Sequence, residues 1–248
     1  MKIGIIGAGH IGAGLAKRLV VLGHEVAIAN SRGPESLKAV AADTGARPES
    51  VTDVVKGPAV IVIAIPEKSV LSLPTGLFRD VPTSVVVADT GNYYPGRDGV
   101  IAELESLALT ESEWVAKTIG RPVLKVFNNI LSQSLVARGR PKGVSGRIAL
   151  PLAGDDRQGK DVLSGLVDAL GFDPIDGGSL AESWRQQPGT PVYCTDLDAA
   201  NATRALQSAV RSASPGQRDR SWKEFVSNPG LSHDEVLKRI RALHPKAP

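Results

Sequence analysis

Residues 2–12 read KIGIIGAGHIG, and this stretch decides the fold of the chain. Its first part, Lys2–Ile6, is rich in β-branched residues and is typical of a strand. A glycine-rich turn follows, and the next segment carries apolar residues at a helical period before a second strand-like run at Glu25–Ala29. We therefore expect an N-terminal βαβ unit of about thirty residues.

The turn matches the pattern G-x-G-x-x-G, with the residues Gly7, Ala8, Gly9, His10, Ile11 and Gly12. In such a turn the first glycine permits a tight bend, the second lets the backbone approach a pyrophosphate, and the third allows close packing of helix on strand. Free amides at the start of the helix supply an anion site. The position after a strand and before a helix favours a dinucleotide site over a simple tight connection.

The end of the second strand indicates which dinucleotide is bound. Folds that bind NAD place a carboxylate there to hold the ribose 2′-hydroxyl, and that carboxylate repels a 2′-phosphate. This chain has Asn30, Ser31 and Arg32 instead. Ser31 can donate a hydrogen bond to the phosphate and Arg32 a charge-assisted one. The prediction is NADP(H), the alternative being that Ser31 and Arg32 are ordinary turn residues.

Alternating strands and helices continue along the chain. We predict an α/β Rossmann fold, a doubly wound, mostly parallel sheet with a smaller, mainly helical C-terminal part. The predicted parts are residues 1–137, which bind NADP, and residues 148–248, which complete the sheet and the acceptor cleft. Further strands are expected at Ala59–Ile65, Val85–Ala88, Val123–Phe127, Ile148–Ala153 and Phe172–Ile175, and helices at Ser36–Ala42, Ser50–Val55, Glu111–Ile119 and Asp155–Leu170.

Capping patterns predict two helices near the C-terminus. Thr195 with Asp198, and Ser232 with Glu235, have the spacing of a capping box before apolar periodic residues. The polar segment Ala213–Ser221 between them is expected to be a mobile loop. The last helix, up to Leu243, would suit intrachain packing, a partner or a homodimer.

The composition excludes several classes of protein. The chain has 248 residues, of which 42% are hydrophobic and 22% charged, so it can bury a core. Its longest apolar run, Ala59–Pro66, is too short to span a membrane, and no signal peptide is evident. A net charge of +3 is weak evidence for nucleic acid. The single cysteine, Cys194, cannot form an internal disulfide, and no cluster has metal-ligand spacing, so we expect a cytoplasmic protein without a metal.

Polar residues at strand ends are further candidates for the site. Ile65 and Pro66 stand at the end of the most apolar strand and should face the cofactor, because ligands sit at the carboxyl ends of parallel strands; the alternative is that Pro66 only ends the strand. The segments Asp89–Asn92 and Asn128–Asn129 follow later strands and are either ligand contacts or turns. Lys125, inside an apolar strand, must lie at an edge or be paired with an acid.

An ordered series of motifs resembles the NADP oxidoreductase family that uses the deazaflavin coenzyme F420. The resemblance covers about residues 1 to 182, and nucleotide-binding domains of membrane ferric reductases share much of the pattern. It implies an NADPH site that includes Ile65 and Pro66, with Asn128 near the nicotinamide and the acceptor above it. The motifs are Gly7–Gly12, Asn30–Arg32, Ala64–Pro66, Val123–Asn128, Leu152–Asp156 and Leu170–Leu180.

The resemblance implies hydride transfer between NADP(H) and a flat acceptor, either coenzyme F420 or a flavin. Residues 181–194 depart from the family pattern, so the acceptor could instead be a ferric chelate, a quinone or a cyclic imine. Hydride transfer needs alignment more than side-chain chemistry, and no catalytic residue is assigned. For an imine, the proton donor would be Tyr193, His10 or a bound water, the alternative being that His10 only begins the helix beside the diphosphate and that Tyr193 packs with its hydroxyl satisfied. Cys194 is a poor nucleophile, and Trp184 either stacks on a ring or is simply buried. A protein that senses NADPH without turnover is the alternative from another class.

Overall fold

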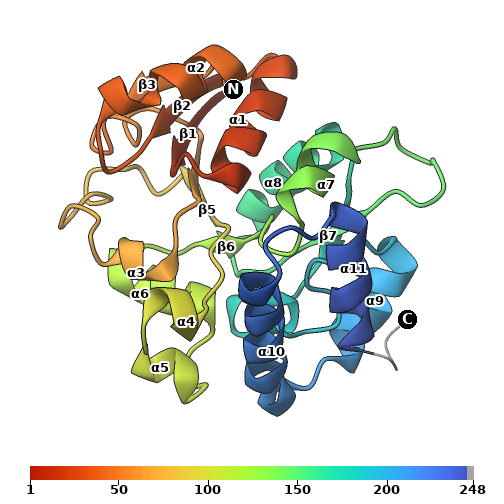
Figure 1. Ribbon diagram of the computed structural model, residues 1–248. Coiled ribbons are helices and arrows are strands. Elements are labelled where there is room, and N and C mark those ends of the chain that lie inside the picture. The colour runs from red at the N-terminus through yellow and green to blue at the C-terminus, as the bar shows by residue number, and fades with distance from the viewer. Residues whose placement is uncertain (245–248) are drawn as a thin grey trace.

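Six parallel strands form one sheet in the computed structural model, which describes residues 1–244 (Figure 1). Their order is β3-β2-β1-β4-β5-β6, so the chain moves outward from β1 first in one direction and then in the other. This is the predicted doubly wound Rossmann sheet. The strands are β1 (Lys2–Ile6), β2 (Glu25–Ala29), β3 (Arg47–Glu49), β4 (Val60–Ile63), β5 (Val86–Asp89) and β6 (Leu124–Lys125).

A second, two-stranded parallel sheet follows, made of β7 (Ala149–Leu152) and β8 (Asp173–Asp176). It is joined to β6 by an antiparallel bridge between Lys125 and Ala153. The α-helices are α1 (His10–Val21), α2 (Lys38–Thr44), α3 (Glu67–Val70), α4 (Pro95–Asp98), α5 (Ala102–Glu105), α6 (Glu111–Ile119), α7 (Ser132–Ala137), α8 (Arg157–Ala169), α9 (Ala199–Ser208), α10 (Ser214–Ser227) and α11 (His233–Ala242). Short 3₁₀ helices lie at Pro34–Leu37, Leu180–Gln186 and Arg211–Ala213.

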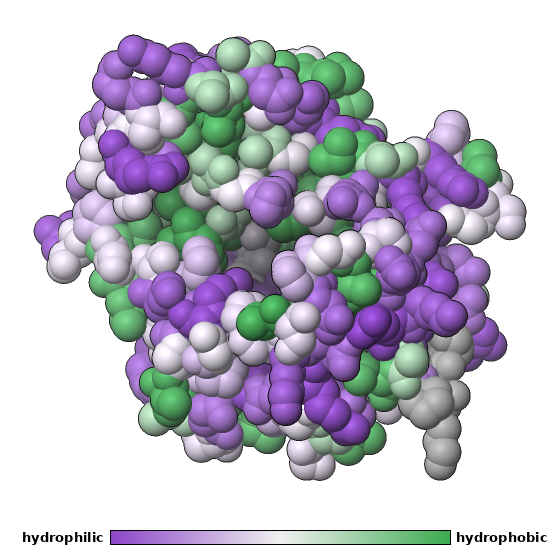
Figure 2. All heavy atoms as spheres, in the orientation of Figure 1, coloured by the Kyte–Doolittle hydropathy of each residue, from purple (hydrophilic) through white to green (hydrophobic). Residues whose placement is uncertain are grey.

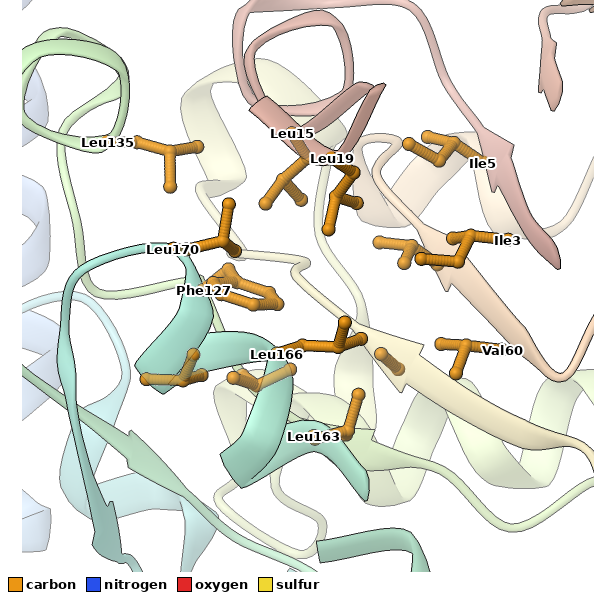
Figure 3. Close-up of a cluster of buried hydrophobic side chains, with 14 of the residues drawn as sticks. Ile3, Ile5, Leu15, Leu19, Val60, Phe127, Leu135, Leu163, Leu166 and Leu170 are labelled. Carbon is orange, nitrogen blue, oxygen red and sulfur yellow. The ribbon is translucent and has the colours of Figure 1, made fainter. Parts of the chain in front are cut away.

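Both faces of the sheet are buried at its centre, which explains why the central strand β4 is continuously apolar. On one face, α1 and α8 pack against β1 and β4; Leu163 and Leu166 of α8 lie in the same cluster as Ile3 (Figure 3). On the other face, Ile6 and the apolar side of α6 form a second cluster. Because α8 comes late in the chain, the predicted C-terminal part shares the core of the N-terminal sheet.

Two local predictions in the N-terminal half were wrong. Residues 50–55, predicted as a helix, form successive turns, and the short strand β3 just before them was missed. β3 has only three residues, one of them Pro48, and pairs with β2 alone. Such an edge strand lacks the apolar pattern that marks a buried one.

Two predictions near the C-terminus also needed correction. The predicted loop at residues 213–221 is helical and belongs to α10. The buried face of α10 is polar, with Ser214, Arg218 and Ser221, so no hydrophobic period marks it. The N-cap of α9 is Asp198, whose side chain accepts a hydrogen bond from the Asn201 amide, and not Thr195.

The predicted capping box of Ser232 with Glu235 is present in α11. Residues 245–248 of the predicted second part lie outside the described residues.

Candidate functional site

A cleft of about 870 Å³ lies at the carboxyl ends of β1, β2 and β4. This is the edge of the sheet at which ligands bind in doubly wound folds. The molecule is hollowed near the centre of the face seen in Figure 2, with apolar residues above the hollow and hydrophilic residues below it. The predicted site residues that line the cleft are Gly7, Ala8, Gly9, Asn30, Ser31, Arg32, Ile65 and Pro66.

The glycine turn has the geometry that its spacing predicts. Gly7 has a φ of +115°, and a Cβ there would lie 2.2 Å from the Ala64 carbonyl oxygen. A Cβ on Gly12 would lie 2.0 Å from the Gly7 oxygen, so that glycine permits close packing beneath the turn. A Cβ on Gly9 would meet no protein atom within 4 Å. Gly9 thus leaves open space where the first turn of α1 begins.

The loop after β2 is held by Asn30. Its side-chain oxygen accepts from the Arg32 amide at 2.9 Å, and its amide nitrogen donates to the Ser36 hydroxyl at 2.9 Å. Ser31 and Arg32 are exposed beside the cleft. Within residues 1–244 their side chains have no hydrogen-bond or ion-pair partner. The loop therefore presents a free hydroxyl and a free guanidinium to the cleft.

The acidic groups near this loop are already neutralised. Glu49 lies opposite Ala29 in the register of β2 and β3, and its carboxylate is 2.7 Å from the Arg47 guanidinium. Asp53 is 2.7 Å from the Lys56 ammonium. That hydrogen bond, with a second one from Ser50, lowers the pKa of Asp53. The end of β2 is thus a local site for an anion.

Four predicted site residues do not line the cleft. His10 is exposed at the start of α1, Ile11 packs against the core, and Gly12 is buried. Asn128 is buried, and its amide nitrogen donates to Asn92 Oδ1 at 3.1 Å and to the Gln186 carbonyl at 2.7 Å. Its own Oδ1 accepts from Gln186 Nε2 at 2.9 Å. Asn128 therefore joins the end of β6 to the residue 180–187 segment.

Several residues that line the cleft were missed by the sequence analysis. Ser50, Val51 and Thr52 follow the missed strand β3, so recognition of that strand would have indicated them. Val51, together with Leu73, which was also missed, adds apolar surface to the lining of the cleft. The remaining missed residues are Ile6, Gly33, Ala64, Ser69, Ser72 and Pro74.

A buried charge cluster lies at the carboxyl ends of the neighbouring strands. Lys125 Nζ is fully buried, 3.0 Å from Glu111 Oε2 and 3.8 Å from Asp89 Oδ2, and it donates to the Gly91 carbonyl at 2.9 Å. Burial opposes its charge, but Glu111 and Asp89 outweigh burial and raise the pKa of Lys125. Of the two alternatives predicted for Lys125, exposure at an edge or pairing with an acid, the structure shows the pairing. The cluster fixes the turn that follows β5.

The segment that departs from the family pattern is largely closed to solvent. The Tyr193 hydroxyl accepts from the Tyr94 hydroxyl at 2.8 Å, and burial raises the pKa of Tyr193. Burial also raises the pKa of the Cys194 thiol, which makes it a weak nucleophile. Trp184 is buried, with the Arg185 guanidinium 4.4 Å from its ring centre. These contacts leave none of the three side chains free.

Among residues 1–244, no three His, Cys, Asp or Glu side chains are grouped so that they could bind a metal ion. In the same residues, no helix combines the length and apolar character needed to cross a membrane.

Relatives of known sequence or structure match much of the chain. Protein YjhV of Escherichia coli K12 is 34% identical over 125 residues, which are 50% of this chain and 84% of that protein. The crystal structure of protein SMa0349 from Sinorhizobium meliloti superposes with a TM-score of 0.64 at 30% identity, covering 74% of this chain and 87% of the other. The rat metalloreductase STEAP3 is 29% identical over 183 residues, which are 73% of this chain but 35% of that protein.

Residues 2–93 match the family described as NADP oxidoreductase, coenzyme F420-dependent. The match covers the glycine turn, the free Ser31 and Arg32, and the strands up to β5, which together form the cleft. The oxidoreductase chemistry and the NADP(H) cofactor follow from this family, as the residues indicated. This chain belongs to the coenzyme F420-dependent NADP oxidoreductase family.

Proposed function

We propose that this protein transfers hydride between NADP(H), held in the cleft, and a flat acceptor such as coenzyme F420 or a flavin. The observation that carries the proposal is the free Ser31 and Arg32 pair at the end of β2. A 2′-phosphate supplies the acceptor oxygens that both side chains lack. Because Glu49 and Asp53 are neutralised by their own partners, little repulsion opposes that phosphate.

The remainder of the nucleotide fits the same cleft. The pyrophosphate would lie over Gly9, where the protein leaves open space beside the free amides that begin α1. The adenine would meet the apolar surface of Val51 and Leu73. The nicotinamide half would then pass Ile65 and Pro66, at the end of β4, toward the end of β5. Bound there, NADPH supplies a hydride, and the protein aligns it with the acceptor.

A flat acceptor is favoured over a cyclic imine by the state of the possible proton donors. An imine needs a proton donor within reach of its nitrogen, and the candidates are Tyr193, His10 or a bound water. The Tyr193 hydroxyl is buried against Tyr94, and His10 is exposed outside the lining of the cleft. Hydride transfer to a deazaflavin or flavin ring depends chiefly on the alignment of the two rings.

A ferric chelate is a second candidate acceptor. The 29% identity to the rat metalloreductase STEAP3 favours it, although the match spans 35% of that protein. An assay of NADPH oxidation with different acceptors distinguishes a flat acceptor from a ferric chelate. We expect NADPH oxidation with coenzyme F420 or a flavin in an anaerobic panel that also contains ferric citrate, a quinone and a cyclic imine. Oxidation with ferric citrate alone would favour the second candidate.

The phosphate contact is tested by calorimetric titration with NADPH and NADH. Arg32→Ala should weaken NADPH binding by about 1.5–3 kcal/mol, the value of a hydrogen bond to a charged group, and leave NADH binding nearly unchanged. Lys38→Ala is the matched control, because Lys38 is exposed, pairs with Glu35 and lies outside the cleft. Equal affinity of the native protein for the two nucleotides would contradict the assignment.

A further inference from the structure

Glu67 is a carboxyl group without a hydrogen-bond partner among the described residues, and it lies next to the proposed nicotinamide site. It directly follows Pro66, which lines the cleft, and its side chain is fully buried. Within the described residues, neither carboxyl oxygen has a hydrogen-bond partner. Gly91 makes room for it, since a Cβ at Gly91 would lie 2.5 Å from Glu67 Oε1. A buried carboxyl without hydrogen bonds is strongly disfavoured in its charged form.

Acidic groups outnumber basic groups around Glu67. Asp89 and Glu111 both accept hydrogen bonds that suit the ionised form: Asp89 from Ser112 and the Gly91 amide, Glu111 from Lys125 and the Tyr93 amide. Burial, and then the charges of Glu111 and Asp89, raise the pKa of Glu67 well above its ordinary value of 4.5. The groups that face it are Asp89 of β5, Glu111 of α6, Lys125 of β6, and Asp98 and Arg97 of α4.

The Arg97 guanidinium lies close enough to Glu67 to stabilise its ionised form. Arg97 Nη2 lies 4.0 Å from Glu67 Oε2, and it also pairs with Asp98 at 2.8 Å. A small movement of this guanidinium would give an ionised Glu67 a charged partner. The burial of Glu67 and its acidic neighbours favour its protonated form, and one added positive charge nearby would shift it toward ionisation.

The redox reaction of the nicotinamide supplies such a charge, because the ring is neutral in NADPH and cationic in NADP⁺. In the proposed binding mode, the adenosine half lies at β2 and the nicotinamide half crosses β1 to the ends of β4 and β5. Glu67 and Gly91 follow those two strands. The inference rests on the proposed function for this placement.

We propose that Glu67 keeps its proton when NADPH is bound and releases it when NADP⁺ is bound, so that its protonation state follows the redox state of the nicotinamide. In the binary complex with NADP⁺ the proton goes to solvent. In turnover, hydride leaves NADPH with two electrons, and an acceptor that gains two hydrogens takes up one further proton. The ionisation of Glu67 offsets that uptake, and the carboxyl takes a proton from solvent when NADPH binds again.

Proton exchange on binding is measured by calorimetry at pH 7 in buffers of different ionisation enthalpy. We expect NADP⁺ to release up to about one proton more than NADPH does in the native protein. Glu67→Gln, which keeps the shape but cannot ionise, should abolish that difference. Asp53→Asn is the matched control, since Asp53 lies beside the same cleft but is exposed and paired with Lys56; it should preserve the difference.

A second measurement does not depend on the variant. The infrared difference spectrum between the NADPH and NADP⁺ complexes of the native protein should show the loss of a protonated carboxyl C=O band. Equal proton exchange for the two bound nucleotides, or a difference that persists in Glu67→Gln, would overturn the inference and leave the proposed function intact. If neither nucleotide binds, the proposed function itself fails.

Discussion

The nucleotide cleft and the buried charge cluster lie at the same edge of one sheet, yet their polar groups are arranged in opposite ways. In the cleft, Ser31 and Arg32 are exposed and have no partner within residues 1–244. In the cluster, Lys125 and Asp89 are buried and form an ion pair with each other. Lys125 also donates a hydrogen bond to the Gly91 carbonyl, and Asp89 accepts one from the Gly91 amide. Free polar groups beside open space are able to bind a ligand, whereas buried groups with satisfied hydrogen bonds stabilise the fold.

Glu67 combines features of both regions. Glu67 is buried, like the residues of the cluster. Its carboxyl oxygens have no hydrogen-bond partner among the described residues, like the side chains of Ser31 and Arg32 in the cleft. The glycine turn shows the same contrast on a smaller scale. Gly12 is required by the close approach of the Gly7 oxygen, while Gly9 faces open space. We therefore expect stability to depend on the buried charge cluster and nucleotide affinity to depend on the cleft.

The largest effect is expected for Lys125→Met. The substitution leaves the buried carboxylates of Glu111 and Asp89 without their cation, and removing one partner of a buried pair costs about 3–5 kcal/mol. We expect a loss of this size in the free energy of unfolding, measured by urea denaturation. The control is Lys117→Met, because Lys117 forms an exposed pair with Glu103 that contributes roughly 0–1 kcal/mol. Equal losses in the two variants would show that burial does not set the role of Lys125.

The glycine turn, the loop after β2 and the doubly wound sheet could be predicted from the sequence because their signals are local. The glycine turn and Asn30–Arg32 are short motifs at strand ends, and the apolar strands mark the doubly wound sheet that the structure shows. The pairing of Lys125 could be predicted from the cost of burying a charge, but its partners could not. Glu111 and Asp89 come from other elements, and only the tertiary structure brings them together.

The failures also have physical causes. β3 is an edge strand of three residues, so its pattern is weak, and missing it hid the part of the cleft formed by Ser50–Thr52. α10 buries Arg218 against Glu105 at 2.9 Å and over the Tyr93 ring, and so lacks an apolar stripe. Glu67 gave no sequence signal, since a single glutamate after a strand is ordinary until its surroundings are known.

A smaller effect, confined to binding, is expected for Gly9→Ala. Gly9 has a φ of −77°, which alanine adopts, and the added Cβ meets no protein atom within 4 Å. The free energy of unfolding should change by roughly 0.5 kcal/mol or less. NADPH affinity should fall by about 1–3 kcal/mol, because the methyl group would occupy the space of the pyrophosphate. Calorimetric titration and urea denaturation measure the two quantities.

Gly12→Ala reverses this pattern and serves as the comparison. Its Cβ would lie 2.0 Å from the Gly7 oxygen, so the turn must shift and stability should fall. If Gly9→Ala binds NADPH as tightly as the native protein does, the pyrophosphate does not lie over this glycine.

The smallest effect is expected for Asn30→Ala. The side chain makes no ion pair, but it holds the loop through Arg32 and Ser36. Losing these hydrogen bonds should weaken NADPH by about 0.5–1.5 kcal/mol, less than the removal of Arg32 itself. An effect as large as that of Arg32→Ala would show that Asn30 contacts the nucleotide directly.

Asn30→Asp separates positioning from charge. The aspartate keeps an oxygen for the Arg32 amide, so the loop should stay ordered. It also places a carboxylate at the end of β2, where NAD-binding folds hold the ribose 2′-hydroxyl and where a 2′-phosphate is repelled. The ratio of NADPH to NADH affinity should therefore fall in Asn30→Asp and change less in Asn30→Ala. The opposite order would mean that the phosphate lies away from this loop.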